Sequence, residues 1–358
     1  SPLRFNWQTP ILISPHNQDI IYFGSNKLHR SFNKGDDWEE ISKDLTSGGK
    51  KGNVPYGTIT SFDESNFQFG KLIVGSDDGI VSISNDSGKT WKSVSDNLPP
   101  DLWVSRVIFS KHEKNTIYLS LNGYRYNDFK PYIYVSNDNG DSWENISSNL
   151  PLSPVNVIRE DINRKEILYV GTDNGLFISF NSGKKWHPFE SSLNRVAVHD
   201  LVIQNEKNDL LVGTHGRSIY KTNLDLFNDF MIEKNGEKPL IIFEINDLRH
   251  SNSWGKRSNY SDDVFKSSVK TIVYSDKSII YDYTITDNFN NILNKGKLNL
   301  DKGFNNIEIM PMINYSIATK KLKKIGISSE KSEDGNIYLP KGDYILKIND
   351  FSRKFSIK

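Results

Sequence analysis

SNDSGKTW, residues 84–91, belongs to a short pattern that occurs four times and decides the fold. The other copies are SFNKGDDW (31–38), SNDNGDSW (136–143) and SFNSGKKW (179–186), so that all four read S-x-[DN]-x-G-x-x-W. The four tryptophans, at positions 38, 91, 143 and 186, are separated by 53, 52 and 43 residues. Repeats of this length are typical of units that bury their apolar faces by stacking on one another.

Each copy lies among short runs of β-forming residues. Two runs precede the pattern, as in KLIVGSDDGIVSIS, and one follows it, as in WKSVS. A further run opens each unit: TPILISP, TITSFDE, SRVIFSK, VNVIRED and, in a fifth copy that lacks the pattern, VHDLVIQ. Four strands in about 40–50 residues predict the blades of a β-propeller. We therefore expect residues 1–226 to form five blades of an all-β protein, as a complete ring or as part of a larger propeller.

The chemistry of the pattern fits a structural role. A tight hairpin between the third and fourth strands needs a residue that tolerates a positive φ, which the glycine supplies, and an Asn or Asp side chain that bonds the turn amides. The tryptophan offers a large apolar surface to the neighbouring sheet, so we expect the four tryptophans to be mostly buried. Two copies carry Asn33 and Asn181 where the others carry Asp86 and Asp138. Because an amide cannot titrate, a catalytic role for this position is disfavoured.

These motifs resemble the Asp-box (BNR) repeat proteins. The runs around residues 6–46, LYVGTDNGLFISFNSGKKW and LVGTHGRSIY resemble the sortilin-like BNR-repeat proteins of bacteria, which are often titled glycosyl hydrolases. The resemblance implies that further blades precede this region and that the propeller binds protein or peptide. Sialidases share the Asp-box, but no F-R-I-P segment is present here. Xyloglucan hydrolases use two aspartates across two propellers.

The C-terminal third has a different texture. Residues 227–260 are polar and irregular, which predicts a connector, and residues 261–358 alternate like strands, which predicts a small β-sandwich. The pairing of GFNNIEIM with LPKGDYILKI resembles the immunoglobulin-like domains, including type A sorting domains, at the C-termini of exported bacterial proteins. That resemblance implies an extracytoplasmic location: periplasm, cell surface or secreted.

Composition narrows the classes of partner. The 358 residues carry 45 basic and 44 acidic side chains, so bulk charge gives no reason to expect nucleic acid or an anionic membrane. The chain has no cysteine, which excludes disulfides and thiolate metal sites, and no apolar run approaches the ~20 residues of a membrane span. It starts at Ser1 without an initiator methionine or a signal-peptide pattern, as expected for a processed or cut piece. We predict no cofactor and no metal.

The loops between the second and third strands should gather on one face of the propeller, where ligands approach. The insertion from Gly123 to Pro131 is the longest of these loops and concentrates residue types that dominate binding hot spots. The predicted binding residues are Tyr124, Arg125, Tyr126, Asp128, His215 and Arg217. The structural alternative has Phe129 and Tyr132 pack inward and Asp128 bond to Arg125.

Two functional classes remain open. A non-catalytic binding or scaffold propeller would grip a protein or peptide partner, with the missing N-terminal blades or an envelope complex among the candidates. A glycoside hydrolase, xyloglucanase-like or sialidase-like, would instead need two facing carboxylates in a cleft. The candidate carboxylates are Asp78, Asp128, Asp161 and Asp173. We also expect the fifth blade to lack its outer strand, and the first or fifth blade to be covered by the connector, the sandwich or further blades.

Overall fold

The computed structural model describes residues 2–50, 56–189, 195–225, 227, 230, 238–257, 263–314, 319–328 and 330–358. The chain divides into two compact units, each described by itself. Unit 1 comprises Ser1–His187 and Leu193–Asn223, and unit 2 comprises Pro188–Ser192 and Leu224–Lys358. Within the described ranges, no helix has both the length and the apolar character needed to cross a membrane.

Unit 1 consists of five antiparallel sheets, each made of strands consecutive in the chain. The first blade contains β1 (Ile11–Ile13), β2 (Ile21–Gly24), β3 (Leu28–Ser31) and β4 (Glu39–Glu40), and the second contains β5 (Ile59–Glu64), β6 (Leu72–Ser76), β7 (Val81–Ser84) and β8 (Lys92–Ser93). The third contains β9 (Trp103–Phe109), β10 (Ile117–Asn122), β11 (Tyr132–Ser136) and β12 (Glu144–Asn145), and the fourth contains β13 (Val155–Glu160), β14 (Leu168–Thr172), β15 (Gly175–Ser179) and β16 (Trp186–Pro188). The fifth contains β17 (Val198–Gln204), β18 (Asp209–Thr214) and β19 (Ile219–Asn223).

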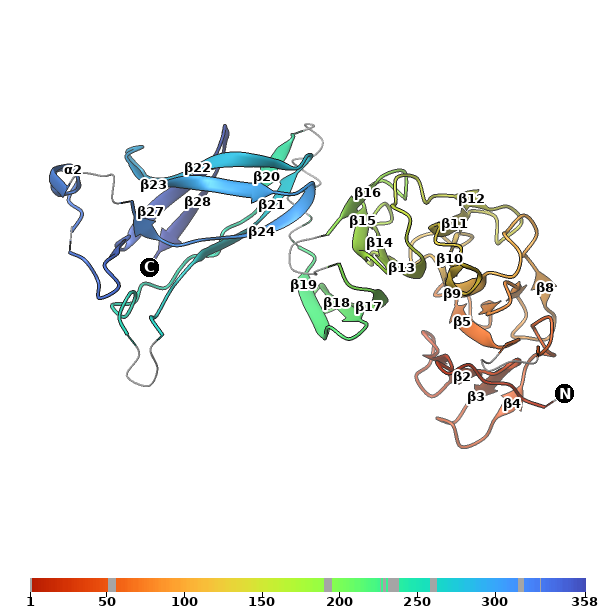
Figure 1. The fold of residues 1–358 in the computed structure, drawn as a ribbon. Helices are drawn as coiled ribbons and strands as arrows, with labels where there is room; N and C mark the ends of the chain where they lie inside the picture. Colours follow the sequence, from red (N-terminus) through yellow and green to blue (C-terminus); the bar gives the residue numbers. More distant parts are fainter. Residues whose placement is uncertain are drawn as a thin grey trace. The chain divides into compact units, whose positions relative to one another are not determined.

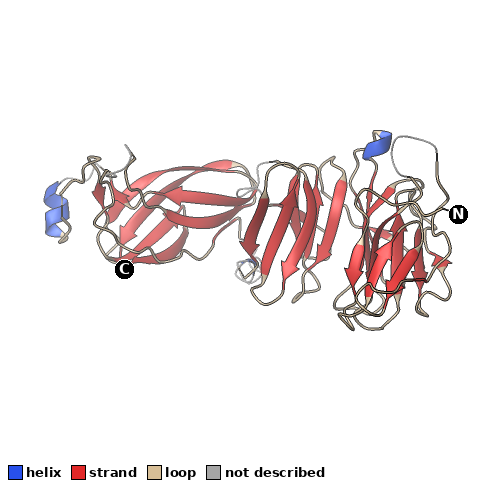
Figure 2. Ribbon diagram, turned by 90° about the horizontal axis from the view of Figure 1, so that it is seen from below, coloured by secondary structure: helices blue, strands red, loops and turns tan. Residues whose placement is uncertain are grey.

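This arrangement confirms the predicted blades. In Figure 1 the sheets of unit 1 follow one another along an arc, and Figure 2 shows their strands as separate layers. The cores lie between blades: one buried cluster joins Tyr22 and Ile41 of the first blade to Ile59 and Leu72 of the second. As predicted, the fifth sheet has three strands among the described residues.

The repeated pattern forms the hairpin between the third and fourth strands of a blade. In the second blade, the backbone N–H of Gly88 donates to Ser84 Oγ at 2.9 Å, and the Asp86 carboxylate accepts the backbone N–H of Thr90 at 2.8 Å and its hydroxyl at 2.6 Å. Gly88 has a φ of 87°, in the region where a β-carbon is disfavoured. The turn chemistry read from the sequence is therefore confirmed.

Each tryptophan of the second to fourth patterns fastens its blade to the preceding one. The indole N–H of Trp91, Trp143 and Trp186 donates to the backbone carbonyls of Ile41, Val94 and Ile146, at 3.0, 2.8 and 2.8 Å. Trp186 is 1% exposed, and Trp91 and Trp143 are half-buried. The expectation of burial is wrong for Trp38, which is 46% exposed because no preceding blade lies against it among the described residues.

Unit 2 contains two sheets around a shared core. One has the order β20 (Leu240–Ile242), β21 (Val269–Ser275), β24 (Gly303–Ile309), and the other has the order β23 (Ile292–Leu300), β22 (Ile279–Asp287), β27 (Gly342–Ile348), β28 (Phe351–Ile357). A short pair, β25 (Met312–Ile313) and β26 (Ile337–Tyr338), and the helix α2 (Thr319–Lys324) complete it. Val273 and Ile307 of the first sheet share one buried cluster with Ile285 and Leu346 of the second, as in a β-sandwich.

The segment predicted as a connector contributes to unit 2. Its residues 240–242 form β20, which pairs with β21, and Leu248 forms an isolated bridge with Ile357. An aromatic cluster in the same unit joins Phe189 to Phe227 and Phe304. The predicted border at residue 226 lies outside the described residues, and the immunoglobulin-like character of the sandwich stays a prediction.

Candidate functional site

The loop that joins β10 to β11 contains four of the predicted binding residues, Tyr124, Arg125, Tyr126 and Asp128. The 3-10 helix η1 (Tyr124–Tyr126) opens the loop, and Asn127 follows it with a φ of 56°. The backbone N–H groups of Tyr126 and Asp128 both donate to the carbonyl of Gly123, at 2.9 and 3.1 Å. The insertion is therefore an ordered turn that holds its side chains in defined positions.

Arg125 is positioned by the second and third blades together. Its guanidinium lies 4.3 Å from the ring of Trp103, and its Nη1 lies 3.7 Å from the Asp77 carboxylate. That separation is too long for a hydrogen bond, and within the described residues neither Arg125 Nη1 nor Trp103 Nε1 has a hydrogen-bond partner. Both of these nitrogen atoms are buried, so the base of the loop contains two donors that lack an acceptor within the described residues.

Asp77 is fixed beneath this guanidinium. Its carboxylate accepts the backbone N–H groups of Gly57 and Thr58, at 2.8 and 2.9 Å, and the Thr58 hydroxyl at 3.0 Å. Burial raises the pKa of Asp77, while the Thr58 hydrogen bonds and Arg125 act in the opposite direction. The carboxylate is a support for the arginine, because three hydrogen bonds hold it in place.

The structure gives Asp128 a different partner from the one in the structural alternative. Its carboxylate accepts the Tyr132 hydroxyl at 2.6 Å and the backbone N–H of Lys130 at 3.1 Å, and the Tyr132 hydrogen bond lowers the pKa of Asp128. The bond between Asp128 and Arg125 that the structural alternative includes is not formed, because the arginine turns toward Asp77. Asp128 therefore shapes the loop.

Exposed aromatic side chains lie in the same loop as Arg125. Tyr124 is 61% exposed and Tyr126 is 51% exposed, and the Tyr124 ring packs edge-on against Phe129 at 5.9 Å. Phe129 is itself exposed, so the inward packing considered from the sequence is wrong for this ring. Tyr126 also faces Tyr56 of the segment between the first and second blades.

Sequence reasoning missed Trp103, Tyr56 and Lys50. The Lys50 ammonium donates to the Tyr56 hydroxyl at 2.7 Å and lies near its ring. Lys50 and Tyr56 come from the segment that joins the first and second blades, and Trp103 is the first residue of β9. The sequence already places these positions at the same end as the loop. Their position at the same end of the blades as the loop was the signal that could have identified these residues. The prediction relied instead on the length and composition of the insertion.

His215 and Arg217 lie in the turn between β18 and β19 of the fifth blade. Both are exposed, and the His215 ring lies 5.3 Å from that of His199. Among the described residues, no hydrogen bond, ion pair or ring contact joins them to the insertion. In the first strand of the same blade, β17, Asp200 forms ion pairs with Arg106 at 2.8 Å and with Arg159 at 3.2 Å.

The carboxylates named as candidates for a hydrolase mechanism accept hydrogen bonds from other residues of the protein. Asp78 accepts the Ser47 N–H at 2.8 Å, Asp173 accepts the Asn156 amide at 2.8 Å, and Asp161 accepts the Tyr169 hydroxyl at 2.6 Å. Asp161 lies in the turn between β13 and β14, at the end of the blade opposite to Asp173, which follows β14. These partners favour a structural role for each group.

The fold and this loop-rich end define a β-propeller of Asp-box blades. The family model described as "Sortilin, neurotensin receptor 3" (Sortilin-Vps10) matches residues 131–338, which is more than half of the chain. The protein belongs to the Sortilin-Vps10 family.

Individual relatives and solved structures match with low sequence identity or over only part of their length. The vacuolar protein sorting/targeting protein PEP1 of Saccharomyces cerevisiae is 31% identical over 99 residues, which cover 28% of this chain and 5% of the yeast protein. An ancestral GH74 enzyme superposes with a TM-score of 0.50 at 14% identity, over 84% of this chain and 39% of the enzyme. The GH74 xyloglucanase of Xanthomonas campestris gives 0.49 at 11% identity, over 99% and 55%. The likeness to the ancestral GH74 enzyme shows the fold alone.

Proposed function

We propose that this propeller is a non-catalytic module that binds a protein or peptide through the loop end of unit 1. The observation that carries the proposal is the Arg125 cluster, in which two buried donors without an acceptor among the described residues accompany a loop with two exposed tyrosines, Tyr124 and Tyr126. An arginine held by a carboxylate and an indole loses little entropy when it binds, and rigid aromatic side chains offer large contact areas. Membership of a family described by the receptor sortilin supports the same reading.

Peptide selection tests this proposal. Peptides enriched from a random library on the whole protein should lose about tenfold or more in affinity when Tyr124 and Arg125 are both changed to Ala, because truncating hot-spot residues costs 1–2 kcal/mol or more. Fluorescence anisotropy measures the affinity, and thermal melts report the fold. Lys130→Ala, an exposed change in the same loop, is the matched control. Failure to enrich any peptide, or equal affinity for the double variant, would contradict the proposal.

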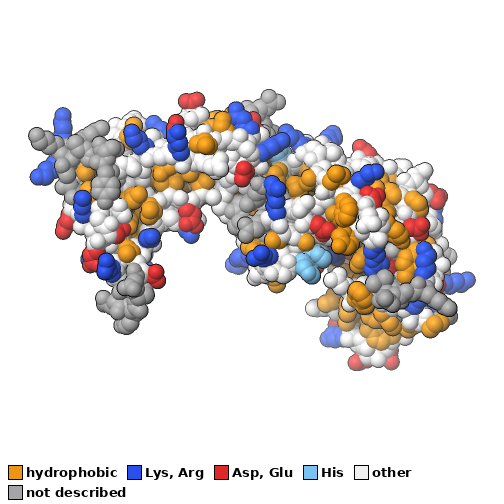
Figure 3. Space-filling view, viewed as in Figure 1, with side chains coloured by type: hydrophobic (Ala, Val, Ile, Leu, Met, Phe, Trp, Pro, Cys, Tyr) orange, Lys and Arg blue, Asp and Glu red, His pale blue; other side chains and the backbone are white. Residues whose placement is uncertain are grey.

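We also propose that the outer face of the first blade contacts a further propeller blade. In β1, Leu12 packs toward the second blade, so the alternation of a strand turns Ile11 and Ile13 to the other face. Ile11 is 67% exposed, and Trp38 and Trp7 are also exposed. Figure 3 shows hydrophobic side chains gathered at the end of unit 1 that carries β2 and β3. The other three tryptophans of the pattern each contact a preceding blade, and among the described residues this face has no such blade.

A fusion tests the second proposal. A copy of residues 57–102, joined by a flexible linker before Ser1, supplies a blade that contains Val94, whose carbonyl accepts the indole N–H of Trp143 in the native chain. It should raise the melting temperature and protect Trp38 from acrylamide quenching, measured against matched Trp38→Phe proteins. Unchanged quenching with a folded fusion would contradict a blade as the partner.

A further inference from the structure

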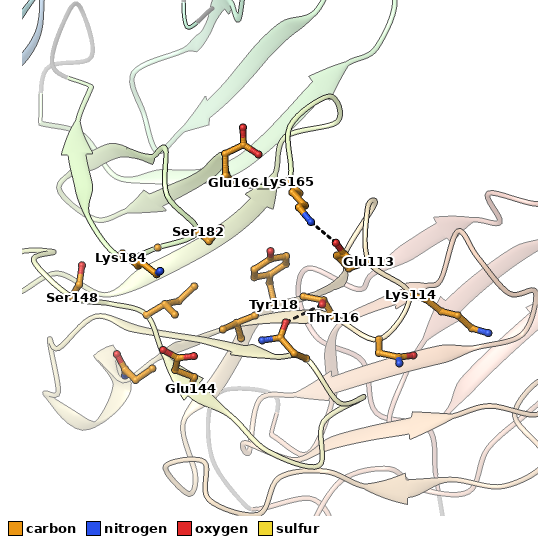
Figure 4. A pocket seen from close by; sticks show the side chains of 16 residues that line it. Glu113, Lys114, Thr116, Tyr118, Glu144, Ser148, Lys165, Glu166, Ser182 and Lys184 are labelled. Atoms are coloured by element: carbon orange, nitrogen blue, oxygen red, sulfur yellow. Dashed lines mark hydrogen bonds and ion pairs between the residues drawn. The ribbon is translucent and has the colours of Figure 1, made fainter. Parts of the chain in front are cut away.

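Unit 1 has a pocket of about 670 Å³ between the third and fourth blades. It lies at the Asp-box end of the blades, opposite to the loop that carries Arg125. Figure 4 shows Tyr118 and Thr116 on one side of this space and Ser182 and Lys184 on the other. Val135 and Glu144 also line it. The same position between the first and second blades, and between the second and third, is occupied by a side chain of the protein, and those side chains indicate which ligand would fit this pocket.

Between the first and second blades, the equivalent space is filled by Arg30. Its guanidinium lies 2.6 Å from the Glu39 carboxylate, and its Nη1 donates to the carbonyl of Ser87 in the next hairpin at 3.4 Å. The guanidinium also lies beside the Tyr22 hydroxyl, which donates to the buried Glu64 at 3.0 Å. Arg30 is thus a buried cation that joins two blades.

Between the second and third blades, the cation is Lys71. Its ammonium donates to the carbonyl of Lys114 at 3.0 Å and to Asn139 Oδ1 of the next hairpin at 2.5 Å. The side chain is buried, and the ammonium lies 5.3 Å from the ring of Phe109. Both of these blade interfaces therefore enclose a cationic side chain.

The third blade has short residues at both positions. Val135 precedes the serine of its Asp-box as Arg30 does in the first blade. Thr116 occupies the place of Lys71, because its carbonyl accepts the N–H of Ser110 as that of Lys71 accepts the N–H of Ser65. Neither side chain reaches the next hairpin, and the pocket is the space that remains.

The groups that surround Arg30 have counterparts at the pocket. Glu144 follows Trp143 as Glu39 follows Trp38, and Ser182 precedes the hairpin glycine as Ser87 does. The Tyr118 hydroxyl donates to the buried Glu160 at 3.2 Å, which repeats the pair of Tyr22 and Glu64. A carboxylate, a hairpin carbonyl and a phenol backed by a carboxylate are present, and the arginine is not.

We propose that this pocket binds a guanidinium group, the side chain of an arginine in a partner polypeptide, in the position that Arg30 occupies one interface earlier. The planar donors of a guanidinium fit a carboxylate and a carbonyl together, which a lysine ammonium does with fewer bonds. This inference concerns the end of unit 1 opposite to the proposed peptide-binding loop and does not rest on that function.

The other charges at the pocket set the expected strength. Lys165 is paired with Glu113 at 2.7 Å, whereas Lys184 has no ion pair among the described side chains and faces the pocket (Figure 4). Lys184 will repel a cationic ligand, so binding should be weak and should strengthen in Lys184→Ala.

Titration of the whole protein with Nα-acetyl-argininamide, followed by calorimetry or NMR shifts, tests the proposal. Saturable binding is expected, with a weaker response to Nα-acetyl-lysinamide. Glu144→Gln should weaken arginine binding about tenfold, since it replaces a charge-assisted hydrogen bond with a neutral one. Glu166→Gln, which lines the same pocket but has no counterpart around Arg30, is the matched control and should change affinity less than twofold.

Val135→Arg supplies the ligand from within the chain. It should abolish binding of the arginine probe and raise the melting temperature, because the new guanidinium would repeat the Arg30 contacts. The proposal is overturned if the wild-type protein shows no saturable binding, or if Glu144→Gln and Glu166→Gln have equal effects. A Val135→Arg protein that folds and still binds the probe would also overturn it. If Val135→Arg fails to fold, the Glu144 and Glu166 pair decides.

Discussion

The Asp-box hairpin of the first blade and those of the next three share one sequence pattern but differ in what surrounds them. Gly88, Gly140 and Gly183 lie against Ile41, Val94 and Ile146 of the preceding blade. Around Gly35, a β-carbon would meet only the Trp38 ring of its own hairpin among the described residues. The internal bonds are alike, since the Gly35 N–H donates to Ser31 Oγ at 2.8 Å and the Gly88 N–H to Ser84 Oγ at 2.9 Å.

This difference separates two roles of the pattern. The serine, the Asn or Asp and the glycine form the turn without help from other blades, whereas the tryptophan stabilises the protein only where a neighbouring blade supplies a carbonyl and an apolar side chain. The first hairpin is a folded turn without the interface, which makes it an internal control for the other three.

The largest expected effect is the loss of a buried tryptophan. Trp186→Ala should lower the free energy of unfolding of unit 1 by about 3–5 kcal/mol, because it removes a fully buried ring and its bond to Ile146. Trp38→Ala, at the same position of the first hairpin, should cost less than about 1 kcal/mol. Urea unfolding followed by circular dichroism compares the two. Equal costs would mean that the tryptophan acts within its own hairpin.

A smaller effect is expected when a methyl group is added to the hairpin glycine. Gly35→Ala and Gly88→Ala both place a side chain at a positive φ, which costs about 1–2 kcal/mol. At Gly88 the new β-carbon would also lie 2.6 Å from the Ile41 carbonyl oxygen, so the blades must shift, for about 1–3 kcal/mol more. The excess of Gly88→Ala over Gly35→Ala in chemical unfolding measures the interface. Two identical midpoints would contradict the comparison.

The same division explains what could be predicted from the sequence. The strand runs, the hairpin glycines and the three-stranded fifth sheet depend on neighbours in the chain, and they were predicted. The exposure of Trp38 was not, because the pattern is the same in all four copies and only the presence of a preceding blade decides burial.

The candidate sites divide in the same way. The composition of residues 123–131 identified Tyr124, Arg125 and Tyr126, but the partners of Arg125 come from other blades, so Asp77 and Trp103 could not be assigned from spacing. The arginine pocket exists because the third blade lacks a long cationic side chain at two positions. Val135 stands where the first blade has Arg30, and Thr116 stands where the second blade has Lys71. Aligning the blades would have revealed that difference, whereas a search for known motifs does not.

The smallest effect concerns the Asp and Asn forms of the hairpin. The Asp138 carboxylate accepts the Ser142 hydroxyl at 2.6 Å and the Ser142 N–H at 2.9 Å, and these bonds lower its pKa to about 2. In the fourth hairpin, Asn181 accepts the Lys185 N–H at 2.9 Å, and Lys185 has no hydroxyl to add the second bond that Ser142 makes to Asp138. An aspartate whose pKa is about 3.9 in the unfolded chain and lower in the folded one stabilises the fold above that pH and loses this contribution as the pH falls toward 2.

Asp138→Asn should therefore be slightly less stable than the wild type at pH 6, and the difference should shrink between pH 4 and pH 2. Urea midpoints at pH 6, 4 and 2.5 measure it, with Asn181→Ala as the control whose difference should not vary with pH through this group. A difference that stays constant across the series would show that the charge of Asp138 adds nothing to the hairpin beyond what an amide provides.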